Sequence, residues 1–204
     1  MISGMKQLAC LACALASLLV LCAFRSPQLQ AETAVVQNQP PTNLPDSGRE
    51  GYCWTGSIAA PYRTDAWRCT EGNAIHDPCF SLPDGNYVVC GANPVTGDSG
   101  FTLKLTKPLP QPEGKASADT NQAWMVELND GEVCTPFTGT RPLVAGQVAT
   151  YGCSPNADGR SSVLLGDLDN GEPVWKAKAA TLVRRGTEWK AASIDVVPVK
   201  TVWR

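Results

Sequence analysis

The clearest hairpin in the sequence is Trp124-Met125-Val126-Glu127-Leu128-Asn129-Asp130-Gly131-Glu132-Val133-Cys134. Trp124, Val126 and Leu128 occupy alternate positions, which places them on one face of a strand. Asp130-Gly131 then supplies a tight turn, because the centre of such a turn needs a residue that tolerates positive φ. The pattern predicts two antiparallel strands joined at 129–131.

Similar signals recur along the chain. Clean alternation marks Phe101-Thr102-Leu103-Lys104-Leu105-Thr106, and Tyr87-Val88-Val89 is a β-branched and aromatic run after a turn cluster. Further strands are expected within 144–151 and 162–165, and the segment 174–204 is interpreted as a terminal hairpin. Short strands separated by turns predict an all-β fold, either a disulfide-braced sandwich or a small barrel of short antiparallel strands.

The N-terminus has the pattern of an export signal. A charged Lys6 precedes a nearly continuous apolar run over 8–24, and a polar segment ends at Ala31. We therefore expect residues 1–31 to be a signal peptide, because the apolar run is shorter than the roughly 20 residues that usually span a bilayer. The alternative is an uncleaved N-terminal membrane anchor. Lipid attachment at Cys22 is disfavoured because Leu21 precedes it.

Loss of the leader leaves six cysteines, and an even number in an exported chain predicts three disulfides. Six cysteines allow 15 pairings, which sequence alone cannot distinguish. Our hypothesis is Cys53–Cys69, Cys79–Cys90 and Cys134–Cys153, since the second pair flanks one hairpin and the third ends two neighbouring strands. These six cysteines contain no C-x2-C or C-x4-C pair, so we expect them to form neither a structural metal site nor a thiol redox centre.

Composition divides the rest of the chain into a flexible spacer over 32–50, rich in Gln, Pro, Asn and Ser, and one folded domain over 51–204. Loss of Lys6 and Arg25 with the leader changes the formal net charge from −2 to −4. A mildly acidic chain without basic runs argues against nucleic acid as a partner. No later segment is apolar enough for membrane insertion, so the partner is expected to be a protein or a cell-envelope component.

Two short motifs have simpler explanations than catalysis or metal binding. Gly97-Asp98-Ser99-Gly100 resembles the nucleophile motif of chymotrypsin-like proteases, but the single histidine lies too close in sequence for the two-barrel scaffold. Asp167-Leu168-Asp169-Asn170-Gly171-Glu172 lacks the glycine and glutamate positions of an EF-hand calcium loop. We interpret both as turns, and we expect no catalytic residues, no metal and no cofactor.

The six tryptophans have two possible roles. Buried in sheets they would fill the core, which we expect of Trp124 and Trp203. Exposed together they would suit stacking on a carbohydrate or an aromatic ligand. Trp67, between Asp65 and Cys69, is the better candidate for an exposed tryptophan, although a place in the core is the favoured role.

The cysteine-bounded part of the chain has a distinctive pattern: Asp65-Ala66-Trp67-Arg68-Cys69, Gly72-Asn73-Ala74-Ile75, Asp77-Pro78-Cys79-Phe80 and Val88-Val89-Cys90. It resembles a pattern in uncharacterised exported bacterial proteins, often secreted or surface-attached. The resemblance implies a bacterial periplasmic or extracellular location and carries no established activity.

These observations predict a non-catalytic binding or structural module of the periplasm or cell surface. Its recognition surface is expected where a loop over 65–77 meets a long loop over 107–122, because binding residues concentrate on loops held by a rigid scaffold. The candidate contacts are Trp67, Arg68, Asn73, His76 and Asp77, although the same residues could instead serve only to hold the loop together. The alternative function is a small envelope-directed hydrolase that uses Asp65, Asp77 or Glu71 with His76.

Overall fold

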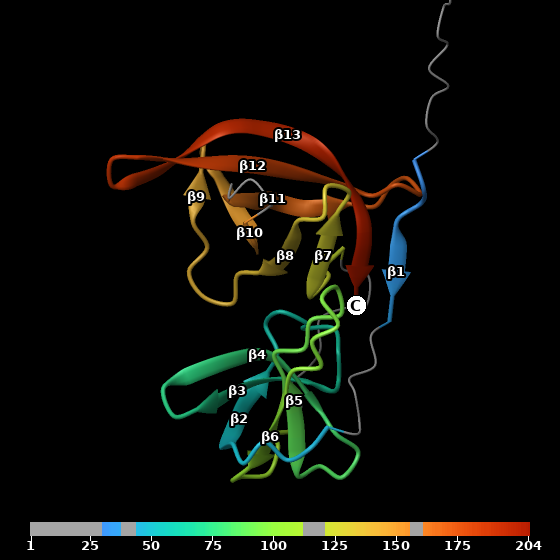
Figure 1. Ribbon diagram of the computed structural model, residues 1–204, viewed down its shortest axis with the longest axis vertical. Coiled ribbons are helices and arrows are strands. Elements are labelled where there is room, and N and C mark those ends of the chain that lie inside the picture. The colour runs from blue at the N-terminus through green and yellow to red at the C-terminus, as the bar shows by residue number, and fades with distance from the viewer. Residues whose placement is uncertain (1–29, 38–43, 112–120, 156–160) are drawn as a thin grey trace, which may run out of the picture.

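The computed structural model describes residues 30–37, 44–111, 121–155 and 161–204. Strands are the regular secondary structure of this described part, which forms a small barrel and a larger curved sheet packed against each other (Figure 1). The prediction of an all-β, disulfide-braced fold is therefore confirmed. No helix within these ranges is long and apolar enough to cross a membrane.

The described residues form thirteen strands. They are β1 (Ala34–Val36), β2 (Glu50–Gly56), β3 (Ala66–Glu71), β4 (Ala74–Ser81), β5 (Tyr87–Cys90), β6 (Phe101–Leu105), β7 (Met125–Leu128), β8 (Val133–Pro136), β9 (Leu143–Val144), β10 (Gln147–Cys153), β11 (Ser161–Asp169), β12 (Lys176–Arg185) and β13 (Glu188–Trp203).

The barrel consists of β2 to β6 in sequence order. Neighbouring strands are antiparallel, and the barrel closes where β2 pairs in parallel with β6 through Glu50 and Gly51. Gly51 is needed at this junction, because a Cβ there would lie 2.1 Å from the carbonyl oxygen of Thr70. Closure removes the open edges that a five-stranded sheet would otherwise expose.

Two disulfides lie inside this barrel. Cys53–Cys69 joins β2 to β3, and Cys79–Cys90 joins β4 to β5. The four cysteines are buried and pack with Trp67, Val88 and Leu103. Cystine thus forms a large part of the core of a unit that is too small to bury many large aliphatic side chains.

The third disulfide, Cys134–Cys153, joins β8 and β10 in the curved sheet, where the two residues lie directly opposite each other. All three predicted pairings are confirmed. Each one links strands that are neighbours in the structure.

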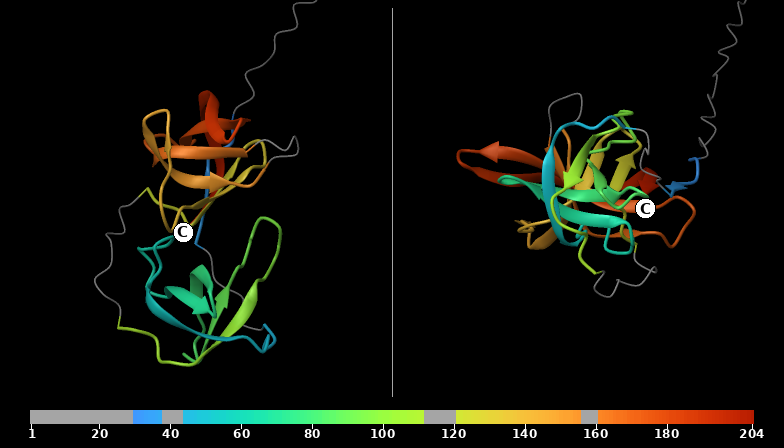
Figure 2. Two further views of the ribbon diagram at one scale, coloured as in Figure 1. Left: turned by 90° about the vertical axis from the view of Figure 1, so that its left-hand side faces the viewer. Right: turned by 90° about the horizontal axis from the view of Figure 1, so that it is seen from below.

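The sheet follows the order β1-β13-β12-β11-β10-β8-β7, with β9 paired to β10. β7 also pairs with the C-terminal part of β13, so the sheet curls back on itself, as the left view of Figure 2 shows. Its core contains Val126, Leu128, Leu164, Leu168 and Trp175, among other residues.

The predicted hairpins are found. β7 and β8 flank a turn in which Gly131 has a φ of 88°, and β12 and β13 form the terminal hairpin around Gly186, which has a φ of 66°. Trp124 and Trp203 are buried, as expected.

The segment over 32–50 is tied down at both ends. β1 pairs in parallel with β13, and the Thr33 hydroxyl donates a hydrogen bond of 2.7 Å to the Val199 carbonyl. Near the other end, the Ser47 amide donates to the Thr102 hydroxyl at 2.9 Å. These parts are held against the folded body instead of serving as a free spacer. Residues 38–43, and residues 1–29 of the predicted leader, lie outside the described residues.

A shared apolar cluster joins the barrel to the sheet. Ala59, Ala60 and Phe80 of the barrel pack against Trp124 and Trp203, and the rings of Phe80 and Trp124 meet edge to face at 5.4 Å between centroids. Arg63 extends this contact, because its guanidinium donates to the Arg204 carbonyl at 3.1 Å.

Removal of the third disulfide should destabilise the protein. We expect Cys134→Ala/Cys153→Ala to lower the free energy of unfolding by roughly 2–4 kcal/mol, because the bridge restricts the unfolded chain across a sequence separation of 19 residues. Urea denaturation followed by circular dichroism measures this loss. A change below about 0.5 kcal/mol, the size expected for a neutral surface substitution, would contradict a stabilising role.

Glu132 should make stability depend on pH. Burial raises the pKa of this carboxyl above its usual value, while a hydrogen bond from Ser162 partly opposes the rise. The folded state therefore favours the protonated form of Glu132. The stability that this provides is fully present below the pKa of Glu132 in the unfolded chain, and it is lost as the pH rises through the higher pKa of the folded state. The Glu132→Gln variant carries no charge at this position at any pH. The difference between its melting temperature and that of wild type should therefore become more positive from acidic to neutral pH. The exposed change Glu188→Gln is the control, and an equal difference at both pH values would refute the role of Glu132.

Candidate functional site

A cavity of about 420 Å³ opens between the barrel and the sheet. We call it the cleft. Its barrel side is formed by Ala59, by Ile75 to Pro78 of β4 and by the loop after β5, and its sheet side by Trp124, Met125, Thr135, Pro136 and Thr138. Two of the five candidate contacts, His76 and Asp77, line it.

Asp77 organises the barrel wall of the cleft. Its side chain is only 1% exposed, and its carboxylate accepts hydrogen bonds from the Ser57 hydroxyl at 2.5 Å and from the Ile58 amide at 3.1 Å. Ser57 also accepts from the Ala60 amide at 2.8 Å. The carboxylate therefore supplies the acceptors that the loop after β2 needs.

Arg68 balances the charge of Asp77 and links it to the sheet. One guanidinium nitrogen lies 3.0 Å from Asp77 Oδ2 and 2.8 Å from the carbonyl oxygen of Thr138. Arg68 also lies over the ring of Trp54, with 5.7 Å between the guanidinium carbon and the ring centroid. Two candidates from sequence, Arg68 and Asp77, thus contact each other and hold the cleft together.

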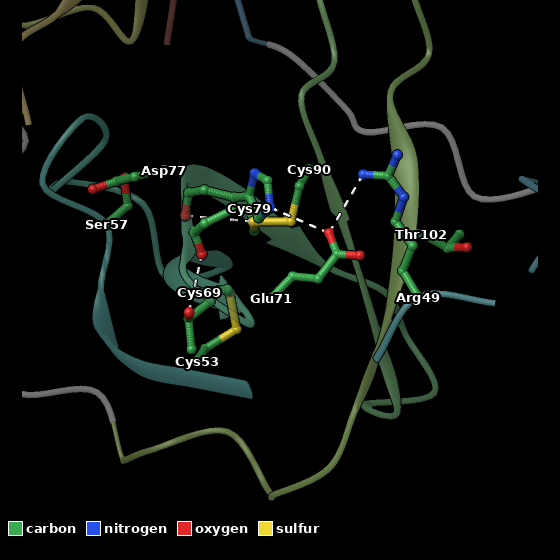
Figure 3. Close-up of a disulfide and its surroundings, with 12 residues drawn as sticks. Arg49, Cys53, Ser57, Cys69, Glu71, Asp77, Cys79, Cys90 and Thr102 are labelled. Carbon is green, nitrogen blue, oxygen red and sulfur yellow. Dashed lines mark hydrogen bonds and ion pairs between the residues drawn. A yellow bond between two sulfur atoms is a disulfide. The ribbon is translucent and has the colours of Figure 1, made fainter. Parts of the chain in front are cut away.

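His76 belongs to a second cluster. Its imidazole Nε2 lies 3.5 Å from the Glu71 carboxylate, and its ring meets Phe101 edge to face at 5.0 Å. Glu71 is also 3.4 Å from Arg49. Figure 3 shows Glu71 and Arg49 on one side of the Cys79–Cys90 bridge and Asp77 with Ser57 on the other.

Trp67, the candidate for an exposed tryptophan, is buried, and the favoured core role is the one that the structure shows. The stretch over 65–77 is largely the hairpin of β3 and β4 instead of a loop, and alternation along β3 turns Trp67 and Cys69 into the barrel core. Trp67 is 5% exposed. The exposed tryptophan of this region is Trp54 on β2, at 41%.

Asn73 lies apart from the other candidates. It occupies the exposed turn between β3 and β4, next to Gly72, whose φ is 56°. A glycine at the first central position suits a two-residue hairpin turn, so Asn73 lies in that turn and is not among the residues that line the cleft. Most of the second expected loop, residues 112–120, lies outside the described residues.

The sheet side of the cleft was missed by sequence reasoning. Trp124, Thr135 and Thr138 come from the strand and loop segments that follow the barrel. Nothing in their local sequence marks them as a group, because packing of the sheet on the barrel brings them together. These residues are also uncharged, so their chemistry did not mark them as candidates for a catalytic or metal site.

The carboxylates proposed for a hydrolase have separate partners. Asp65 forms two hydrogen bonds with Arg63, of 2.9 and 2.6 Å, Asp77 binds Arg68, and Glu71 contacts Arg49. Each acid is engaged by a different arginine. Of the three, Asp77 alone lines the cleft.

The buried sulfurs form a cluster of a different kind. The Sγ atoms of Cys69, Cys79 and Cys90 lie within 4.8 Å of one another, which places the two barrel disulfides side by side. In disulfides these sulfurs are not thiolate ligands, and metals bind the thiolate. The two short motifs are turns only in part. Gly97 lies in the turn that the Asn93–Asp98 bridge closes before β6, whereas residues 167–169 belong to β11 and only residues 170–172 lie in the connection that follows it.

Comparisons with known protein families, with curated proteins and with solved structures return no match to this chain.

Asp77 should be essential for stability. We expect Asp77→Ala to lower the free energy of unfolding by about 3–5 kcal/mol, because it leaves Arg68 without its anionic partner in a largely buried position. Chemical denaturation measures the effect, and Asp77→Asn separates loss of charge from loss of hydrogen bonds. The exposed change Asp84→Ala serves as the control and should cost less than about 1 kcal/mol. Equal effects of the two alanine substitutions would contradict this account of the cleft.

Proposed function

We propose that the protein is a non-catalytic binding module of the bacterial periplasm or cell surface, and that it holds an uncharged part of a cell-envelope component or partner protein in the cleft. The observation that carries the proposal is the cleft itself, about 420 Å³ between two braced β units. This volume lies within the range of about 300–1,000 Å³ that is usual for ligand sites.

The lining of the cleft favours a neutral ligand. No lysine or arginine is among its described lining residues, and its carboxylate, Asp77, is already neutralised by Arg68. Apolar surface comes from Ile75, Trp124 and Met125, while Asn93 and Thr135 offer hydrogen-bonding groups. A ligand with apolar faces and hydroxyl or amide groups, such as a sugar or a peptide segment, matches this mixture.

The scaffold supports a pre-formed binding site. Disulfides brace both units, and the Arg68 contacts with Asp77 and Thr138 tie the two walls together. A pre-formed site reduces the ordering cost of binding. The three disulfides indicate an oxidising environment outside the cytosol, and the resemblance to exported bacterial proteins supports the periplasm or the cell surface as its location.

No observation favours the hydrolase alternative. Glycoside hydrolysis needs two carboxyl groups about 5–9.5 Å apart around the scissile bond. Here the candidate acids are each engaged by an arginine, and only Asp77 faces the cleft. We therefore do not carry this function forward.

Blocking the cleft should abolish binding. Soluble fragments of digested peptidoglycan and neutral oligosaccharides are the probes, and two-dimensional NMR of the backbone amides and tryptophan indoles is the readout. We expect a saturable shift of the signals of Trp124 and Thr135, and its loss in Thr135→Trp, because the exposed Thr135 lies where an indole would fill the opening.

The matched control is Asn86→Trp, which adds the same side chain at an exposed position near the turn before β5 and should bind like wild type. If the shifts occur only outside the cleft residues, or if Thr135→Trp binds unchanged, the cleft is not the binding site.

A further inference from the structure

The longest strand of the sheet leaves part of one edge open. β12 pairs with one side of β13 from Glu188 to Pro198, whereas β7 covers the opposite side only from Val199 to Trp203. Within the described ranges no strand pairs with the open side over 188–197. Figures 1 and 2 show the β12–β13 hairpin reaching beyond the rest of the sheet. An open edge presents unpaired backbone groups that can accept another strand.

This edge also exposes three large apolar side chains: Trp189 is 58% exposed, Ile194 38% and Val196 67%. They lie on one face of the hairpin, because their partners on β12 are Arg184, Ala180 and Lys178, which alternate regularly. Strict alternation along β13 would put Trp189 and Val196 on opposite faces. A bulge prevents this, since Ala192 has no partner between Ala191 and Ser193.

The bulge makes the edge complementary to itself. In an antiparallel pair of two β13 edges with the two-fold axis between Ala192 and Ser193, Trp189 lies opposite Val196 and Ala191 lies opposite Ile194, all on the apolar face. On the other face Lys190 lies opposite Asp195. Each pair occurs twice by symmetry. Aromatic–aliphatic and opposite-charge pairs are the contacts that stabilise antiparallel strands.

The charges select this arrangement over others. A parallel, in-register pair would place Lys190 opposite Lys190 and Asp195 opposite Asp195, which is repulsive. Among the described residues of one chain, Lys190 forms an ion pair with Glu188 at 3.1 Å, and an exposed pair of this kind is weak and readily exchanged. Asp195 has no ion pair within the described part of the chain.

We propose that the protein forms a two-fold symmetric homodimer by antiparallel pairing of the open β13 edge over 188–197. The inference is independent of the ligand in the cleft. The dimer joins two curved sheets into one continuous sheet and covers Trp189 and Val196. It carries two clefts, so binding to a repetitive partner gains from effective concentration.

Charge reversal tests the register. Sedimentation velocity of the purified, oxidised protein over a concentration series up to about 1 mM, the range for weak association, should show a monomer–dimer equilibrium. Lys190→Glu and Asp195→Lys each replace two attractive pairs by two repulsive ones, so each should weaken the dimer by about tenfold or more. The double change Lys190→Glu/Asp195→Lys should restore the wild-type association.

Lys104→Glu is the matched control, because Lys104 is also exposed and paired with a glutamate, Glu50, but lies on the barrel. It should dimerise like wild type. In parallel, hydrogen exchange of amides over 188–197 should slow as the concentration rises. A wild type that stays monomeric throughout overturns the proposal, as does a dimer in which the single charge reversals have no effect or the edge amides gain no protection.

Discussion

The candidate site depends on the interactions of the buried Asp77 carboxylate. A charge placed in the interior must be paired and hydrogen-bonded to be tolerated. Asp77 meets this requirement by taking donors from the loop after β2 and from Arg68, and Arg68 in turn reaches Thr138 beyond the sheet strand β8. The contacts of this one buried charge therefore fix the conformation of the loop after β2, the position of Arg68 on β3 and the position of the sheet relative to the barrel.

The barrel and the sheet are stabilised in different ways. The barrel has few large aliphatic residues, and two adjacent disulfides occupy its centre together with Trp67. The sheet has a larger apolar core and one cross-strand disulfide. Because the two units also share the cluster around Phe80 and Trp124, the wall of the cleft is continuous with buried packing on both sides.

β13 connects these features. It pairs with β12, β7 and β1, contributes Trp203 to the cluster between the units, and ends where Arg63 binds the Arg204 carbonyl. The same strand leaves an apolar edge uncovered over 188–197. Its C-terminal half serves the monomer's fold, and its N-terminal half offers a surface for association.

Local sequence by itself determined the strand content, the hairpin at 129–131 and the terminal hairpin, because alternation and turn chemistry act over a few residues. For the disulfides it supported a hypothesis, and the structure selected that pairing from the 15 possible ones. Local sequence placed Trp67 in a loop, since a tryptophan beside charged residues looks like a loop residue until its strand partners are known. Tertiary structure alone decided the closure of the barrel, the burial of Trp67, the docking of β1 and the meeting of β4 with Thr135 and Thr138 in the cleft. The physical reason is that these features arise from contacts between segments far apart in the chain. The free energy of such contacts depends on how the two units pack, so no short stretch of sequence determines it.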